Sequence, residues 1–188
     1  MKRKRKYRMP FKRKFDKKTD YRKRLKLLYS KKPRLIIRKS SKHIKTQITE
    51  FNPKGDKIIV SATTQDLKKF GWTNSTNIPS SYLTGLLIGK RALKKNINSA
   101  ILDMGLEKSI KGSRIYAVLK GAIDAGLSIP HSTDILPSEE RISGKHIMDY
   151  AQKLKKEDLK KYKKQFSVSK PEKIPEMFEK VKSKIMKG

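Results

Sequence analysis

Few side chains in this sequence are of a type that performs catalysis. Its 188 residues include three histidines, His43, His131 and His146, and no cysteine. None of the histidines accompanies a serine and a carboxylate in a pattern that predicts a catalytic triad, and the spacing of a histidine metal site is missing from the sequence. Without cysteine, the chain has no thiol nucleophile, zinc finger or disulfide framework. Any chemistry must therefore come from its charged side chains.

Two weaker candidates for a reaction centre remain. Asp103 ends a predicted strand and Asp124 lies in the following helix, so the two carboxylates could hold a divalent metal in an RNA-processing enzyme. We favour the simpler interpretation, in which Asp103 caps or anchors a loop and Asp124 forms a salt bridge. The segment 85–91 has only three residues between its glycines, and Arg91 stands where a phosphate-binding loop has Ser or Thr. We therefore predict no enzymatic activity, no cofactor, no metal and no small-molecule substrate.

Net charge gives the strongest functional signal. The chain has 49 Lys and Arg residues against 17 Asp and Glu, a formal net charge of +32. Residues 1–45 carry +20, residues 46–152 carry +4 and residues 153–188 carry +8. Solubility alone needs a net charge of roughly 2–8 in a small domain. The two basic ends therefore predict a polyanionic partner.

The aromatic residues of the N-terminal segment favour nucleic acid as that partner. Lys and Arg neutralise phosphates, while interleaved rings can stack on unpaired bases. The rings are Tyr7, Phe11, Phe15, Tyr21 and Tyr29. Residues 1–18 have too little apolar content to fold alone, so we expect them to be disordered until bound. A solvated charged tail or a nuclear-localisation run is the alternative, and the density of charge makes nucleic acid the better interpretation.

Periodicity predicts an α/β fold with a mixed β-sheet, in the core order β-β-β-α-β-α, packed with helices. The predicted helices are 21–28, 81–96, 114–125, 139–156 and one opened by Pro175; the predicted strands are 34–38, 44–51, 57–63 and 100–103. Gly85, Gly89 and Ala92 line one flank of the helix 81–96, which predicts close approach of a neighbouring backbone. No apolar run is long enough for a membrane span, and the basic N-terminus is not followed by the apolar region of a secretory signal.

Two short segments are candidates for specific RNA contacts. Residues 38–43, Arg-Lys-Ser-Ser-Lys-His, lie at the bend between the first two predicted strands and combine cations with hydroxyls. Such a turn can contact RNA phosphates and 2′-hydroxyls, or it can be an ordinary solvated turn. Gly112, Ser113 and Arg114 open a helix whose N-terminus favours an anion, although a plain helix cap is equally compatible with them.

Seven segments in order resemble one family. They are TDYRKRLKLL (19–28), PRLIIRKSSKHIKTQ (33–47), YLTGLLIGKRAL (82–93), LDMGL (102–106), GSRIYAVLKGAIDAGLSIPHS (112–132), SEERISGKHI (138–147) and EDLKKYKKQFS (157–167). Together they resemble the large-subunit ribosomal protein that binds 5S rRNA, universal large-subunit protein eighteen, in its archaeal and eukaryotic form. The resemblance implies a structural protein, located in the cytoplasm in the large ribosomal subunit, with 5S rRNA, 23S rRNA and neighbouring ribosomal proteins as partners in the central protuberance.

The resemblance also implies where RNA is bound, mainly in the basic N-terminal segment and the loops near it. The implied residues are Lys12, Arg13, Lys14, Tyr21, Arg22, Arg24, Arg34, Arg38, Lys39, Ser40, Lys42 and His43, and less directly Gly112, Ser113, Arg114 and His131. We accordingly divide the chain into an RNA-binding arm (1–32), an α/β core (33–130) and a helical C-terminal extension (131–188).

Overall fold

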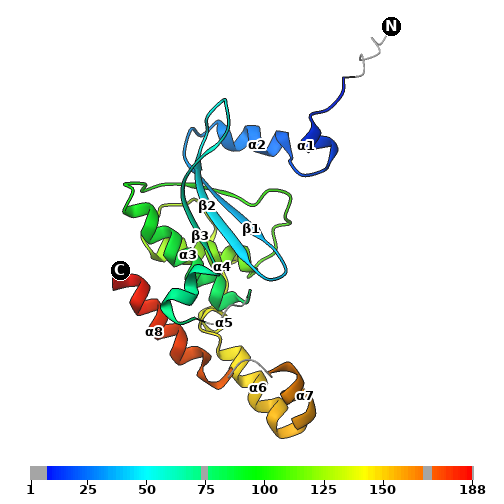
Figure 1. The fold of residues 1–188 in the computed structure, drawn as a ribbon, viewed down its shortest axis with the longest axis vertical. Helices are drawn as coiled ribbons and strands as arrows, with labels where there is room; N and C mark the ends of the chain where they lie inside the picture. Colours follow the sequence, from blue (N-terminus) through cyan, green and yellow to red (C-terminus); the bar gives the residue numbers. More distant parts are fainter. Residues whose placement is uncertain (1–7, 73–75, 167–170, 188) are drawn as a thin grey trace.

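A computed structural model describes residues 8–72, 76–166 and 171–187 of the chain. The strands are β1 (Arg34–Lys39), β2 (Ile44–Glu50), β3 (Lys57–Thr63) and β4 (Ile101–Asp103). The α-helices are α1 (Lys12–Phe15), α2 (Tyr21–Leu28), α3 (Ile78–Leu93), α4 (Arg114–Asp124), α5 (Glu139–Ser143), α6 (Lys145–Glu157), α7 (Leu159–Gln165) and α8 (Ile174–Lys187). Three 3-10 helices are η1 (Asp66–Phe70), η2 (Thr133–Ile135) and η3 (Pro171–Lys173). The predicted α/β class and mixed sheet are confirmed (Figure 1).

The four strands form one sheet in the order β3-β2-β1-β4. β1, β2 and β3 pair antiparallel, the simplest arrangement for three successive strands joined by turns, and β4 pairs parallel to β1. On β2 the alternation separates buried Ile44, Thr46 and Ile48 from exposed Lys45. Since β4 reaches the sheet only after α3, the parallel pairing needs that helix as a crossover.

Helices α3 and α4 pack against one face of the sheet, and their backbones approach each other unusually closely. A Cβ atom built on Gly85 would overlap the carbonyl oxygen of Val118, and one built on Gly121 would overlap the carbonyl oxygen of Tyr82. Both positions lie far inside van der Waals contact, so only glycine fits. The predicted close approach at Gly85 and Gly89 is confirmed, and Gly121 is its counterpart on α4.

The helix boundaries differ from the prediction in two places. α3 begins at Ile78 rather than at residue 81, because the side chain of Asn77 accepts a hydrogen bond from the Ser80 amide and caps the helix earlier. The single helix predicted over 139–156 is divided at Gly144, which has φ +83 and separates α5 from α6. A left-handed glycine ends the first helix and turns the chain into the second.

The C-terminal helix α8 belongs to the core. Phe178, Val181 and Ile185 are buried along one face of it, and the Phe178 ring packs against Trp72 and Tyr82. The i, i+4, i+8 spacing of Met177, Val181 and Ile185 predicts one buried stripe on this helix. The stripe is confirmed at its last two positions, while Phe178 buries more completely than Met177. No α-helix of the described residues is long and apolar enough to cross a membrane.

The arm has more local structure than we expected of residues 1–18. Residues 12–15 form the helical turn α1, and the Phe11 ring lies 5.3 Å from the Tyr21 ring, centroid to centroid. Residues 1–7 lie outside the described part of the chain. The sequence also predicts that Asp20 caps the helix over 21–28. Asp20 does cap α2, but none of the residues of α2 is buried, and Leu25 is 53 % exposed. The arm therefore presents apolar as well as basic side chains at its surface.

Candidate nucleic-acid interface

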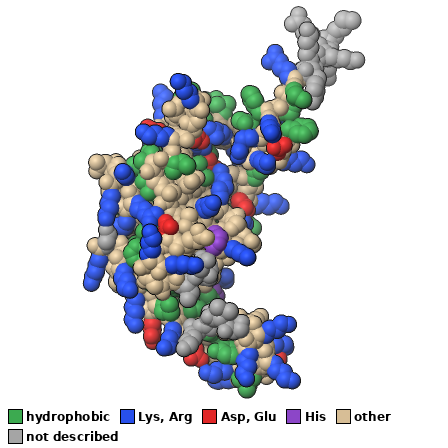
Figure 2. Space-filling model, in the orientation of Figure 1, with side chains coloured by type: hydrophobic (Ala, Val, Ile, Leu, Met, Phe, Trp, Pro, Cys, Tyr) green, Lys and Arg blue, Asp and Glu red, His purple; other side chains and the backbone are tan. Residues whose placement is uncertain are grey.

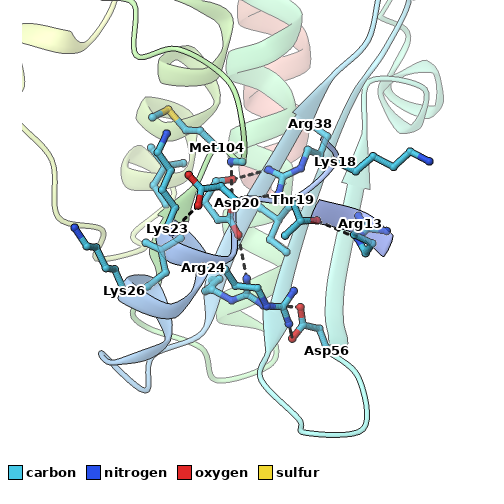
Figure 3. A pocket seen from close by; sticks show the side chains of 16 residues that line it. Arg13, Lys18, Thr19, Asp20, Lys23, Arg24, Lys26, Arg38, Asp56 and Met104 are labelled. Atoms are coloured by element: carbon cyan, nitrogen blue, oxygen red, sulfur yellow. Dashed lines mark hydrogen bonds and ion pairs between the residues drawn. The ribbon is translucent and has the colours of Figure 1, made fainter. Parts of the chain in front are cut away.

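A cavity of about 470 Å³ separates α2 from the sheet, on the face opposite α3 and α4 (Figure 3). Asp20, in the cavity wall, caps the start of α2: its carboxylate accepts hydrogen bonds from the amides of Arg22 at 2.9 Å and Lys23 at 3.2 Å. Cations from the arm, α2 and β1 dominate its wall: Arg13, Lys18, Lys23, Arg24, Lys26, Arg34 and Arg38. A concave basic surface of this kind focuses a positive potential and attracts an anion.

Ion pairs organise the inner wall of this cavity. Asp56, on the turn between β2 and β3, contacts Arg24 at 2.9 Å and Arg34 at 2.5 Å. Asp103, at the end of β4, contacts Arg34 at 3.0 Å and Arg38 at 3.2 Å. These five charges alternate in sign and connect α2, the β2–β3 turn, β1 and the end of β4. The sequence did not predict these ion pairs. It offers only the position of Asp56, directly after Gly55 in the turn between two strands.

The three arginines of this network differ in how accessible they are. Arg34 is 2 % exposed, and its Nε has no hydrogen-bond partner among the described residues. The side chain of Arg38 is 48 % exposed and is held by both the carboxylate and the carbonyl oxygen of Asp103. Arg24 is intermediate. In this conformation Arg34 supports the surface from below, whereas Arg38 is presented to solvent.

The other arm residues predicted to bind RNA lie around the same end of the molecule. Lys12, Arg13 and Lys14 are exposed on α1, and Arg22 is exposed on α2. Large exposed apolar side chains accompany them: Met9, Phe11, Phe15, Leu25 and Tyr29. Exposed apolar groups clustered with cations are typical of a binding surface.

A second group of predicted residues surrounds Thr76. The Thr76 hydroxyl donates to the carbonyl oxygen of Ser41 at 3.1 Å, and the Arg114 guanidinium donates to the carbonyl oxygen of Thr76 at 3.1 Å. The turn between β1 and β2 is thereby linked to the N-terminus of α4, two segments that no sequence pattern connects. Gly112 has φ +66 and donates its amide to Ile135, which adds the loop before α5 to this group.

Within this second group, some side chains are committed to local contacts. The Ser40 hydroxyl donates to the carbonyl oxygen of His43 and accepts from its amide. Lys39 pairs with Glu107 at 2.8 Å. Lys42 is exposed, and so is His131, whose Nδ1 lies 2.8 Å from the carbonyl oxygen of Ile129. Ser113 stands at the N-cap of α4, but its hydroxyl is buried and makes no capping bond.

The two candidate metal carboxylates lie in different places. Asp103 is held by arginines and accepts from the Gly105 amide at 2.8 Å, so the loop-anchoring interpretation is confirmed. Asp124 accepts a 2.7 Å hydrogen bond from the Tyr82 hydroxyl rather than forming the predicted salt bridge, and it lines a separate cavity. Burial, followed by this hydrogen bond, raises the pKa of Tyr82. In the described part of the chain, no three His, Cys, Asp or Glu residues are placed to hold a metal ion.

A comparison with protein families identifies the relatives of this chain. The model of the family described as ribosomal large subunit proteins 60S L5 and 50S L18 matches residues 5–99 and 94–132. The matched segments contain the whole sheet, α3, α4 and both groups of predicted RNA-binding residues. The chain therefore belongs to the 60S L5 and 50S L18 family and is a protein of the large ribosomal subunit.

Proposed function

We propose that this protein is a structural constituent of the large subunit that binds 5S rRNA and helps attach it to 23S rRNA in the central protuberance. One observation carries the proposal: exposed cations line the cavity at the N-terminal end, exposed aromatic rings occur in the same arm, and the carboxylates of the cavity wall are engaged, Asp56 and Asp103 with arginines and Asp20 as the cap of α2. The surface offered to a partner is thus basic and aromatic. That combination suits an RNA with unpaired bases better than a neutral ligand.

Binding at this surface works by charge neutralisation on a preorganised scaffold. Lys12, Arg13, Lys14 and Arg22 contact phosphates, and each contact releases condensed counterions. Arg38 is held by Asp103 through its two terminal nitrogens, and its half-exposed cationic group adds attraction for a phosphate. Arg24 joins it from α2, Tyr21 orders the arm through Phe11, and Arg34 acts as a positioning residue beneath them.

The group around Thr76 forms the second part of the proposed interface. Lys39, Ser40, Lys42 and His43 present the β1–β2 turn to the sugar-phosphate backbone. Gly112, Ser113 and Arg114 add the N-terminus of α4, where amides and the helix dipole favour an anion. His131 extends the surface from the loop that follows α4.

In this proposal each part of the chain has its own role in binding, and none performs catalysis. The arm (1–32) supplies the largest share of the net charge, +15 of +32. The core (33–130) fixes the orientation of the bound RNA, and the extension (131–188) carries further contacts. Structural proteins of the ribosome are generally not enzymes, which agrees with the dispersed positions of Asp103 and Asp124.

Equilibrium binding to 5S rRNA over a salt series tests this function. An unrelated structured RNA and duplex DNA serve as competitors. We expect 5S rRNA to resist both competitors while its affinity falls steeply with salt. Equal competition by all three nucleic acids would instead indicate a general nucleic-acid-compacting protein and would overturn the proposal.

A further inference from the structure

The C-terminal extension builds a second basic surface, remote from the arm. α6 and α7 form a helical hairpin at the opposite end of the molecule from α1 and α2 (Figure 1). Residues 145–165 contain eight lysines and three acidic residues, a net charge of +5. This segment lies beyond the residues matched by the family model.

The hairpin is held together from its inner side. Ala151 and Leu154 of α6 are buried, and the Phe166 ring contacts Tyr150 of α6 and Tyr162 of α7, with centroids 6.5 and 5.5 Å apart. The Lys155 ammonium pairs with Glu172 of η3 at 3.0 Å, which ties the hairpin to the segment before α8. These contacts fix the shape of the hairpin without using its outer surface.

Lysines occupy that outer surface. At 100° per residue, Lys160, Lys163 and Lys164 fall within an arc of about 100° on α7, away from Tyr162. Lys153 and Lys156 are spaced i, i+3 on α6. All five are exposed, and none forms an ion pair with another described residue.

The acidic residue at the start of α7 does little to neutralise this surface. Asp158 caps α7, accepting from the amides of Lys160 and Lys161, and pairs with the Lys161 ammonium at 3.3 Å. These contacts, led by the Lys161 amide, lower the pKa of Asp158. The Asp158 charge is therefore directed at the start of α7 and away from Lys163 and Lys164.

We propose that the outer face of the α6–α7 hairpin binds the phosphate backbone of ribosomal RNA, at a segment other than the one bound by the arm. The inference rests on the proposed function, since it assumes that the chain binds ribosomal RNA. Helical rows of lysine provide point charges for phosphates. Lys and Arg side chains lie at both ends of the molecule as well as over the body between them (Figure 2), and the two ends join two RNA segments.

Neutralising the lysine row of α7 tests the hairpin in the full-length chain. The variant carries Lys160→Gln, Lys163→Gln and Lys164→Gln, which preserve helix propensity. Its matched control carries Lys180→Gln, Lys184→Gln and Lys187→Gln on α8, an equal reduction of exposed charge. Binding to the combined 5S and 23S rRNAs is measured over a salt series, with circular dichroism to verify folding.

We expect the hairpin variant to lose about tenfold or more in affinity near 0.1 M salt, and its log–log salt slope to fall by about 2, since each neutralised phosphate adds roughly 0.7–0.9 to the slope. The control should change much less. Equal effects of the two variants would show that only net charge matters and would overturn the inference. If the unmodified chain binds these RNAs no better than unrelated RNA, the proposed function itself fails.

The absence of cysteine permits a second, positional test. Lys163→Cys on the hairpin and Lys23→Cys on α2 each allow an iron chelate to be tethered at a single site, from which hydroxyl radicals cut nearby RNA. We expect two separate sets of cuts in the bound RNA. Overlapping sets would contradict the inference, because both surfaces would then contact the same RNA segment. Cuts from position 23 alone would also contradict it and would leave an acidic protein as the partner of the hairpin.

Discussion

Asp56 and Asp103 determine which arginines of the basic end face solvent. The chain has nearly three times as many basic as acidic residues, so two carboxylates lower its charge little. Their main effect is to hold Arg24, Arg34 and Arg38 in defined positions. Burying an arginine is costly unless its charge is paired. Both carboxylates pair with Arg34, although its Nε has no hydrogen-bond partner among the described residues. The buried Arg34 is thus the centre from which the more exposed arginines are positioned.

The substitution Asp103→Asn tests this arrangement. It leaves the buried Arg34 guanidinium with only one charged partner, so we expect the free energy of unfolding in urea to fall by about 3 kcal/mol. Glu107→Gln is a suitable control, because its pair with Lys39 is one-third exposed on both sides and should contribute less than about 1 kcal/mol. Similar decreases for the two variants would mean that the network does not stabilise the fold.

At the scale of secondary-structure elements, the contact between α3 and α4 gives the core its shape. Glycines on the facing surfaces let the two backbones touch, and the tight contact places both helices on the same face of the sheet. The opposite face is thereby left to α2 and the cavity. The split of α5 from α6 at Gly144 has a comparable effect, since it allows the hairpin to leave the body of the protein.

Gly121→Ala should disrupt this helix contact. The added Cβ would meet the Tyr82 backbone, which cannot move as a flexible side chain would, so we expect the free energy of unfolding to fall by at least about 2 kcal/mol. Gly85→Ala should behave alike. Gln152→Ala, at an exposed position of α6, serves as the control and should leave the urea midpoint almost unchanged. A normal midpoint for Gly121→Ala would refute the close approach.

As a whole, the molecule is elongated, with the arm at one end and the α6–α7 hairpin at the other (Figure 1). Lys and Arg side chains lie at both ends and over the body between them (Figure 2). Residues 1–45 and 153–188 carry +20 and +8, against +4 for residues 46–152. On the proposed function, RNA is attracted mainly to the two ends, where it would neutralise charges that repel one another. Ordering of the arm would then accompany binding.

Deletion of residues 1–18 removes 11 basic residues and tests the arm at this scale. We expect weaker binding to 5S rRNA and a flatter salt slope, by roughly 0.7–0.9 for each phosphate that the shortened chain leaves unneutralised. The thermal unfolding temperature should hardly change, because the arm contributes no residue to the hydrophobic core among the described residues. An unchanged slope would exclude the arm from the RNA interface.

The sequence by itself determined the local features: the α/β class, the alternating faces of β2, the Asp20 cap, the small flank of α3 and the basic ends. Each depends on residues a few positions apart, where periodicity and capping act directly. Only the tertiary structure decided that Arg34 meets Asp103 across 69 positions, that Tyr82 meets Asp124 across 42, and that Thr76 joins Ser41 to Arg114. Such pairs follow from strand order and helix packing, which bring distant residues together without leaving a pattern along the chain.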